Sequence, residues 1–190
     1  MVRTVRQYPA NDAQYGVRLK NLLYEVYDRH GDTLATFDTR ALAHSYIIGK
    51  VRPGADFRDK GESLNVDPSD WEHVIDVLIQ KRSGHALIDY KPDGVNELML
   101  VWGHRDEPLL GKHGSHIDGF GLAHIEDGHG IEMVLSIPDI LRSGTVTEHP
   151  TDASRVVVNS GANGKLIVAK DWYGEPSPWV ITAVEGKRRA

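Results

Sequence analysis

Cysteine is absent from this 190-residue sequence, which excludes disulfides, thiolate metal sites and a cysteine nucleophile. That absence fits a reducing compartment without proving one. Long apolar runs are missing too, and a membrane-spanning helix needs about 18 such residues or more. The first residues also lack the apolar stretch of a signal peptide. We therefore expect no membrane partner and a cytoplasmic site of action. Export would require another machine or a larger parent chain.

Positive charge is scarce as well. The sequence holds 22 Lys and Arg against 27 Asp and Glu, a net charge of −5, whereas nucleic-acid-binding proteins are usually basic. The charge is unevenly spread, because residues 1–60 and 154–190 each carry +3 while 61–116 and 117–153 carry −5 and −6. Exposed charges are screened beyond about 8–10 Å. A local cationic site in the C-terminal segment is therefore compatible with an acidic total.

The N-terminal third is expected to be helical. Apolar residues recur at near-helical spacing over 11–29, and a second helix is expected over about 39–48. The stretch 51–63 combines proline, glycine and many charges, which is typical of a loop or a domain boundary. The expected division is an N-terminal helical extension of unknown role over 1–66 and a second domain over 67–190.

The second domain changes from helical to strand-like patterning along its length. A helix is expected to begin near Asp67-Pro68 and to end near Arg82, because acids and a proline suit a first helical turn. Strands are then expected at 86–90, 97–102, 155–159, 165–170 and 178–185, with short helices at 122–128 and 137–142. Helices grouped before consecutive antiparallel strands predict an α+β fold with the helices packed on one sheet face.

Several segments follow one another in a distinctive order. They are Asp76-Val77-Leu78-Ile79, then Glu97-Leu98-Met99-Leu100-Val101-Trp102-Gly103, then Gly119-Phe120-Gly121-Leu122-Ala123-His124-Ile125 with His129-Gly130 close behind, then 137–144, and finally Trp179-Val180-Ile181-Thr182-Ala183. In this order residues of about 74–186 resemble the barnase–EndoU–colicin–RelE-like superfamily of phage and bacterial toxin nucleases. Members are often C-terminal domains of phage MuF-type head proteins and polymorphic toxins. Glu126 and Asp127 stand where the family pattern leads us to expect a more basic helix end.

This resemblance implies a mostly antiparallel four-stranded sheet after the N-terminal helices, and RNA cleavage without a metal or other cofactor. It also implies two partners, an RNA substrate and a cognate immunity or antitoxin protein, and delivery within a larger toxin or phage protein. Transfer RNA is a reasonable substrate by analogy. Carried over residue by residue, the family's site falls on His124, then on His129, Arg155, Lys165 and Thr182.

The chemistry of metal-free RNA cleavage suits these residue types. The neighbouring 2′-OH attacks the phosphate and leaves a 2′,3′-cyclic phosphate, so a base, an acid and nearby cations are needed. Histidine suits the proton transfers, and lysine and arginine suit the phosphate charge. We assign His124, His129, Lys165 and Thr182 to catalysis and Arg155 to substrate binding. We interpret His113 and His116 as substrate-binding residues of a glycine-rich loop that borders the RNA path.

Two details of this site stay open. His124 and His129 are five residues apart, which is about 140° on a regular helix, so both face one phosphate only if the helix ends near Gly128. Strict alternation puts Thr182 on one face with Val180 and Val184, where it is either a core residue or a site residue.

Two other functions stay open as well. The first is a non-catalytic structural or protein-binding module of the same fold in a phage or toxin particle. The second is a metallohydrolase built on a cluster of histidines, namely His104, His113, His116, His124 and His129. The sequence has no His-Glu-x-x-His pattern of the kind that builds a helical zinc site, so we expect no metal.

Overall fold

A computed structural model describes residues 13–51, 59–91, 97–110 and 116–186. The chain divides into two compact units. Unit 1 comprises residues 1–59 and 106–118, and unit 2 comprises residues 60–105 and 119–190. The division expected from the sequence treats the chain as two consecutive segments. In the structure, residues 106–118, here called the excursion, leave unit 2, contribute to unit 1 and return.

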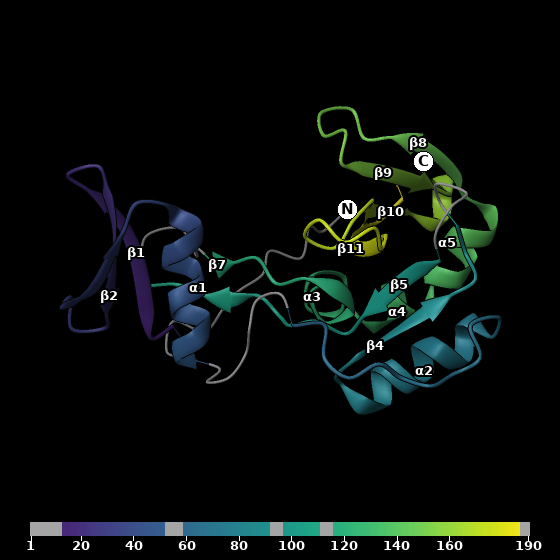
Figure 1. The fold of residues 1–190 in the computed structure, drawn as a ribbon, viewed down its shortest axis with the longest axis horizontal. Coiled ribbons are helices and arrows are strands. Elements are labelled where there is room, and N and C mark those ends of the chain that lie inside the picture. Colours follow the sequence, from purple (N-terminus) through teal and green to yellow (C-terminus); the bar gives the residue numbers. More distant parts are fainter. Residues whose placement is uncertain (1–12, 52–58, 92–96, 111–115, 187–190) are drawn as a thin grey trace. The chain divides into compact units, whose positions relative to one another are not determined.

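Unit 1 is a small antiparallel sheet with one helix and a two-stranded ribbon (Figure 1). Its elements are β1 (Tyr15–Lys20), β2 (Leu23–Asp28), β3 (Thr33–Phe37), α1 (Arg40–Val51), β6 (Glu107–Pro108) and β7 (His116–Ile117). The helix and the excursion supply most of its buried core, which consists of Val26, Ala43, Ile47, Ile48, Leu109 and Ile117. The excursion is therefore part of the core of unit 1.

The helix expected over 11–29 is wrong, because β1 and β2 occupy this stretch. Asn21 and Leu22, both with positive φ, form the two-residue turn between the strands, a geometry that suits tight hairpins. Val17, Val26 and the neighbouring tyrosines are β-branched or aromatic residues, which favour strands. Leu19 and Leu23, one on each side of the turn, made the apolar spacing of the sequence look helical. The helix expected near 39–48 is confirmed by α1.

Unit 2 is built on a six-stranded mixed sheet with strand order β4-β5-β11-β10-β9-β8. Its strands are β4 (His85–Ile88), β5 (Leu98–Val101), β8 (Thr145–Glu148), β9 (Arg155–Asn159), β10 (Lys165–Ala169) and β11 (Trp179–Val184). All neighbours are antiparallel except β5 and β11, which are parallel. Of the expected fold class only α+β stands. The N-terminal segment holds a three-stranded sheet and one helix in place of helices alone, and the single four-stranded antiparallel sheet is wrong.

Two features explain the larger sheet. β8 is an edge strand whose residues are mostly exposed and polar, with only Val146 half-buried, so its hydrophobic pattern is weak. The pairing of Trp179 with Met99 joins β11 to β5 across a long stretch of chain. A parallel contact of this kind is not visible in local periodicity. The sequence therefore predicted the individual strands of the C-terminal meander but not the sheet they complete.

Helices cover one face of this sheet. They are α2 (Trp71–Lys81), α3 (Gly121–His129), α4 (Ile131–Leu135) and α5 (Ile137–Ser143). Residues from all four share one buried core with alternate strand residues such as Val158, Leu166 and Val180. The N-cap of α2 is Asp70, whose carboxylate accepts from the amide of His73. No helix among the described residues is long and apolar enough to cross a bilayer.

Candidate functional site

The entry to α3 is a close backbone contact that fixes the start of the helix. Gly121 has a φ of 72°, and a Cβ at this position would lie 2.4 Å from the carbonyl oxygen of Val101. Two residues further, the amide of Ala123 donates to the carbonyl of Trp102. Only glycine tolerates both the left-handed backbone and the approach. The helix that carries His124 is thereby held against the end of β5.

His124 lies on α3 between buried neighbours. Leu122, Ala123 and Ile125 are buried in the helix-side core, while His124 itself is half-buried. The helix packs against β11 as well as β5. Phe120, the residue before the helix, packs on the opposite face of the sheet with Trp172 and Trp179. The start of α3 therefore lies where the two faces of the sheet meet.

A β-bulge in β11 decides the direction of Thr182. Val180 pairs with Val168 and Thr182 pairs with Ile167, so Ile181 is the extra residue. Val180 and Ala183 both lie in the helix-side core, which leaves Ile181 and Thr182 together on the other face, here called the open face. Strict alternation, which grouped Thr182 with Val180, is wrong. Bulges re-aim side chains in this way and are frequent beside active sites.

Lys165 lies on the open face near Thr182. It pairs with Val184 on β11, and Ile167, two residues along β10, pairs with Thr182. Lys165 and Thr182 are thus diagonal cross-strand neighbours, a relation that puts long side chains within reach. Lys165 is exposed and Thr182 half-buried. These two predicted residues come together.

Arg155 lies on the open face but at the other end of the strands. It pairs with Ala169, whereas Lys165 pairs with Asn159, so the two cations are four strand residues or roughly 13 Å apart along the sheet. Its guanidinium is held by Asp152 at 2.9 Å. The structure therefore does not bring Arg155 to the corner occupied by Lys165 and Thr182.

His129 is not brought to His124 either. α3 continues through His129, and its C-cap is Gly130, with a φ of 85°. Because His129 still lies within the helix, the two histidines keep the separation of about 140° of a regular helix. A shared phosphate between them is not supported.

The acidic residue after His124 is neutralised by two arginines. Glu126, whose side chain is 15% exposed, pairs with Arg82 and with Arg105, the latter at 3.1 Å. Arg82 also lies 4.7 Å from the ring centroid of Trp102. The hydrogen bond from Arg82, aided by Arg105, holds the pKa of Glu126 below its ordinary value. The negative charge of Glu126 is thus compensated by cations from distant parts of unit 2.

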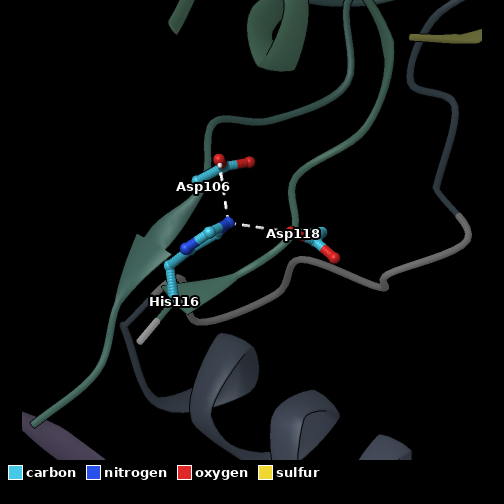
Figure 2. Close-up of side chains that lie close together, drawn as sticks. All are labelled: Asp106, His116 and Asp118. Carbon is cyan, nitrogen blue, oxygen red and sulfur yellow. Dashed lines mark ion pairs between the residues drawn. The ribbon is translucent and has the colours of Figure 1, made fainter. Parts of the chain in front are cut away.

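His116 belongs to unit 1, where it forms a cluster with two aspartates (Figure 2). Its Nε2 lies 2.8 Å from Asp118 Oδ1 and 3.5 Å from Asp106 Oδ2. The side chain of Asp106 is completely buried and that of Asp118 is 83% exposed. His113, the other expected loop residue, lies outside the described residues.

Sequence reasoning missed both aspartates of this cluster and the two arginines at Glu126. Asp106 and Asp118 flank the strands β6 and β7, which are only two residues long, so no periodicity marks them. Arg82 follows the last residue of α2, and the sequence marks it only as the expected end of that helix. The one usable signal in the sequence was the acidic residues of α3, because each of them could have been expected to pair with a cation.

Comparisons with protein-family models, with curated proteins and with solved structures found no match to this chain.

Proposed function

We propose that unit 2 is a metal-independent endoribonuclease that cleaves RNA through attack of the 2′-OH and leaves a 2′,3′-cyclic phosphate. The observation that carries the proposal is the bulge in β11, which turns Thr182 to the face of Lys165. The same strand packs against α3, the helix of His124. Its support from the sequence is the resemblance of residues 74–186 to toxin nucleases.

The proposal divides the chemistry among three side chains. His124 comes from the helix-covered side of the sheet and Lys165 and Thr182 from the open face, so the RNA phosphate has to lie at the end of the sheet, where both sides can reach it. His124 takes the proton from the attacking 2′-OH and delivers it to the departing 5′-oxygen as the P–O5′ bond breaks, because the pKa of an imidazole is close to working pH. The ammonium of Lys165 faces the charge that builds on the phosphate oxygens. The hydroxyl of Thr182 donates one hydrogen bond to a non-bridging oxygen. His129 and Arg155 are left outside this set because of where they lie, and His116 because it belongs to unit 1.

The proposal includes the partners and setting expected for such a toxin. RNA is the substrate, with transfer RNA the first class to test, and a cognate immunity or antitoxin protein protects the producing cell. The site of action is the cytoplasm. Fold and activity are separate matters, since one fold hosts many specificities.

The test is cleavage of total RNA in EDTA by the purified chain, read on a gel. We expect fragments ending in a cyclic phosphate, and a loss of rate of about 100-fold or more for His124→Ala, the usual size of a general acid–base contribution. Thr182→Val removes only the hydroxyl, and we expect at least about a tenfold loss, near the 1–1.5 kcal/mol of one hydrogen bond.

Thr147→Val is the matched control. Thr147 of β8 pairs with Val157 of β9. It lies in the same row of the open face as Thr182 but three strands away, which is about 14 Å. We expect its rate to stay within twofold of the parent. RNA that stays intact over a wide range of folded protein, or fragments that His124→Ala produces equally well, would contradict the nuclease.

A non-catalytic protein-binding module is the second candidate. It is favoured by Val157 and Ile167, half-buried apolar residues that lie between Thr147 and Thr182 on the open face. Apolar surface in the middle of an open sheet face suits a protein partner. Intact RNA together with unchanged folding of all variants would favour this candidate over the first.

A further inference from the structure

The excursion brings three metal-binding side chains together at its base. Asp106 precedes β6, His116 lies in β7, and Asp118 follows β7. Glu107 pairs with Ile117 across the ribbon, so the two aspartates stand opposite each other where the chain enters and leaves unit 1. Figure 2 shows the imidazole of His116 directed at both carboxylates. This convergence follows from the pairing of the ribbon and not from sequence proximity.

We infer that Asp106, His116 and Asp118 bind a divalent transition-metal ion, with Zn²⁺ as the first candidate. Imidazole nitrogen and carboxylate oxygen both bind zinc, and three protein ligands leave a fourth position for water. This site belongs to unit 1 and is separate from the nuclease proposed for unit 2.

The distances suit such an ion. Zinc binds nitrogen and oxygen ligands at about 2.0–2.2 Å, so two ligand atoms of a tetrahedral site lie about 3.3–3.5 Å apart. Nε2 of His116 is 3.5 Å from Asp106 and 2.8 Å from Asp118, and one ligand atom from each residue lies within 4.8 Å of the others. Asp118 is the exposed member, so it can move by the few tenths of an ångström that the ion needs.

Burial makes the cluster more than a group of surface acids. The carboxylate of Asp106 has no exposed area, and a buried carboxylate is stabilised only by a cation or by strong hydrogen bonds. A divalent ion would neutralise both aspartates while leaving His116 uncharged, which is the form that binds metal. It would also fix the two points where the excursion joins unit 1.

His44 of α1 is the nearest further histidine. Its pKa is lowered by burial first and by Arg40 next, while Asp118 has a smaller raising effect and His116 a smaller lowering one, so His44 lies near the cluster. The guanidinium of Arg40 donates to its Nε2 at 3.2 Å, which occupies the nitrogen that would otherwise bind. We therefore leave His44 out of the ligand set and assign three protein ligands.

The experiment is a calorimetric titration of the tag-free, full-length chain with Zn²⁺. We expect one ion per chain and, in NMR spectra of the imidazoles, a shift at Nε2 of His116. Asp118→Asn should weaken binding at least tenfold, and its exposure protects the fold. Asp38→Asn, a change at an exposed carboxylate before α1, should stay within twofold of the parent.

Two results would overturn the site. One is the lack of saturable binding up to about millimolar Zn²⁺, and the other is an equal affinity in Asp118→Asn and Asp38→Asn. Asp106→Asn serves as a second ligand variant, with amide NMR spectra as the check that unit 1 is folded. RNA cleavage is measured in EDTA, so the metal site and the nuclease can fail independently.

Discussion

Each of the two units contains a glutamate that is paired with two cations, one of which lies over an aromatic ring. We call this arrangement the electrostatic device of the unit. In unit 1, Glu25 lies between Arg18 at 2.8 Å and Lys20 at 3.4 Å, and Arg18 lies 4.9 Å from the ring centroid of Tyr27. In unit 2, Glu126 lies between Arg82 and Arg105, with Arg82 over Trp102. Each carboxylate is mostly buried, each is paired with two partly exposed cations, and each has a lowered pKa.

The two devices differ in the number of residues that separate the paired side chains along the sequence. Arg18, Lys20 and Glu25 lie on neighbouring strands of one hairpin, so the pairing adds to contacts that the turn already brings together. Arg82 and Glu126 are 44 residues apart, and Arg105 and Glu126 are 21 apart. The same chemistry therefore supports local structure in unit 1 and tertiary structure in unit 2. Local context, rather than the ion pair itself, decides the effect on stability.

The largest expected effect comes from removing the excursion. Replacing residues 106–118 with a short Gly-Ser linker takes Leu109 and Ile117 from the core of unit 1, at about 1.5–3 kcal/mol for each buried side chain. A core of this size cannot absorb that loss, so we expect unit 1 to unfold. Amide NMR spectra should lose the dispersed signals of β1–β3 and α1.

Unit 2 should stay folded in the same variant. His104 and Phe120 exchange two backbone hydrogen bonds, at 3.2 and 3.1 Å, and these hold together the two points where the excursion begins and ends. Retention of the unit 2 spectrum would sharpen the contrast between the units. Unfolding of both would show that they form one cooperative whole.

The next effect concerns glycines with similar backbones. Gly121 in unit 2 and Gly31 in unit 1 have φ values of 72° and 89°, but only Gly121 would place a Cβ against backbone atoms. We expect Gly31→Ala to cost about 1–2 kcal/mol, the left-handed penalty alone, and Gly121→Ala to cost about 3 kcal/mol or more because the helix entry must shift. Urea unfolding of both variants measures the difference, and equal costs would contradict the close contact.

The smallest expected effect comes from removing the negative charge of the glutamate in each electrostatic device. Glu126→Gln should cost about 1–2 kcal/mol at neutral pH, the range for hydrogen bonds to a charged group after allowance for exposed partners. The pKa of Glu126 is lowered on folding, so its stabilisation is present above the unfolded pKa and is lost as pH falls through the folded value. The cost should therefore shrink on acidification below about pH 4.

Glu25→Gln is the control for this prediction. Because its partners lie on the same hairpin, we expect a smaller loss of stability than for Glu126→Gln, with the same direction of pH dependence. Unfolding by urea at neutral and acidic pH measures both variants. A loss at Glu25 as large as that at Glu126 would remove the distinction between local and long-range pairing.

The sequence predicted elements where one period dominates. The helix expected between Asp67-Pro68 and Arg82 is present as α2, and the strands expected at 155–159 and 165–170 are present as β9 and β10. It failed where two periods coincide, because Leu19, Leu23 and Tyr27 fit a helix by spacing although they lie on strands joined by a left-handed turn at Asn21. Tertiary packing overrode that local pattern.

The site was predictable only in part for a similar reason. Lys165 and Thr182 belong to neighbouring strands that the sequence indicated, but one extra residue in β11 changed the face of Thr182. Alternation cannot detect a bulge. The partners of His116 depended on the pairing of Glu107 with Ile117, in strands too short to leave a pattern.

The strand order of unit 2 has a consequence during translation. Among the described strands β11 is the last in sequence order, yet it lies in the interior of the sheet between β5 and β10. A nascent chain that has emerged only through β10 holds two separate strand groups, β4-β5 and β8-β9-β10, each with an unpaired inner edge. The ribosome must release β11 before these groups can join, so the sheet forms late and its exposed edges need protection until then.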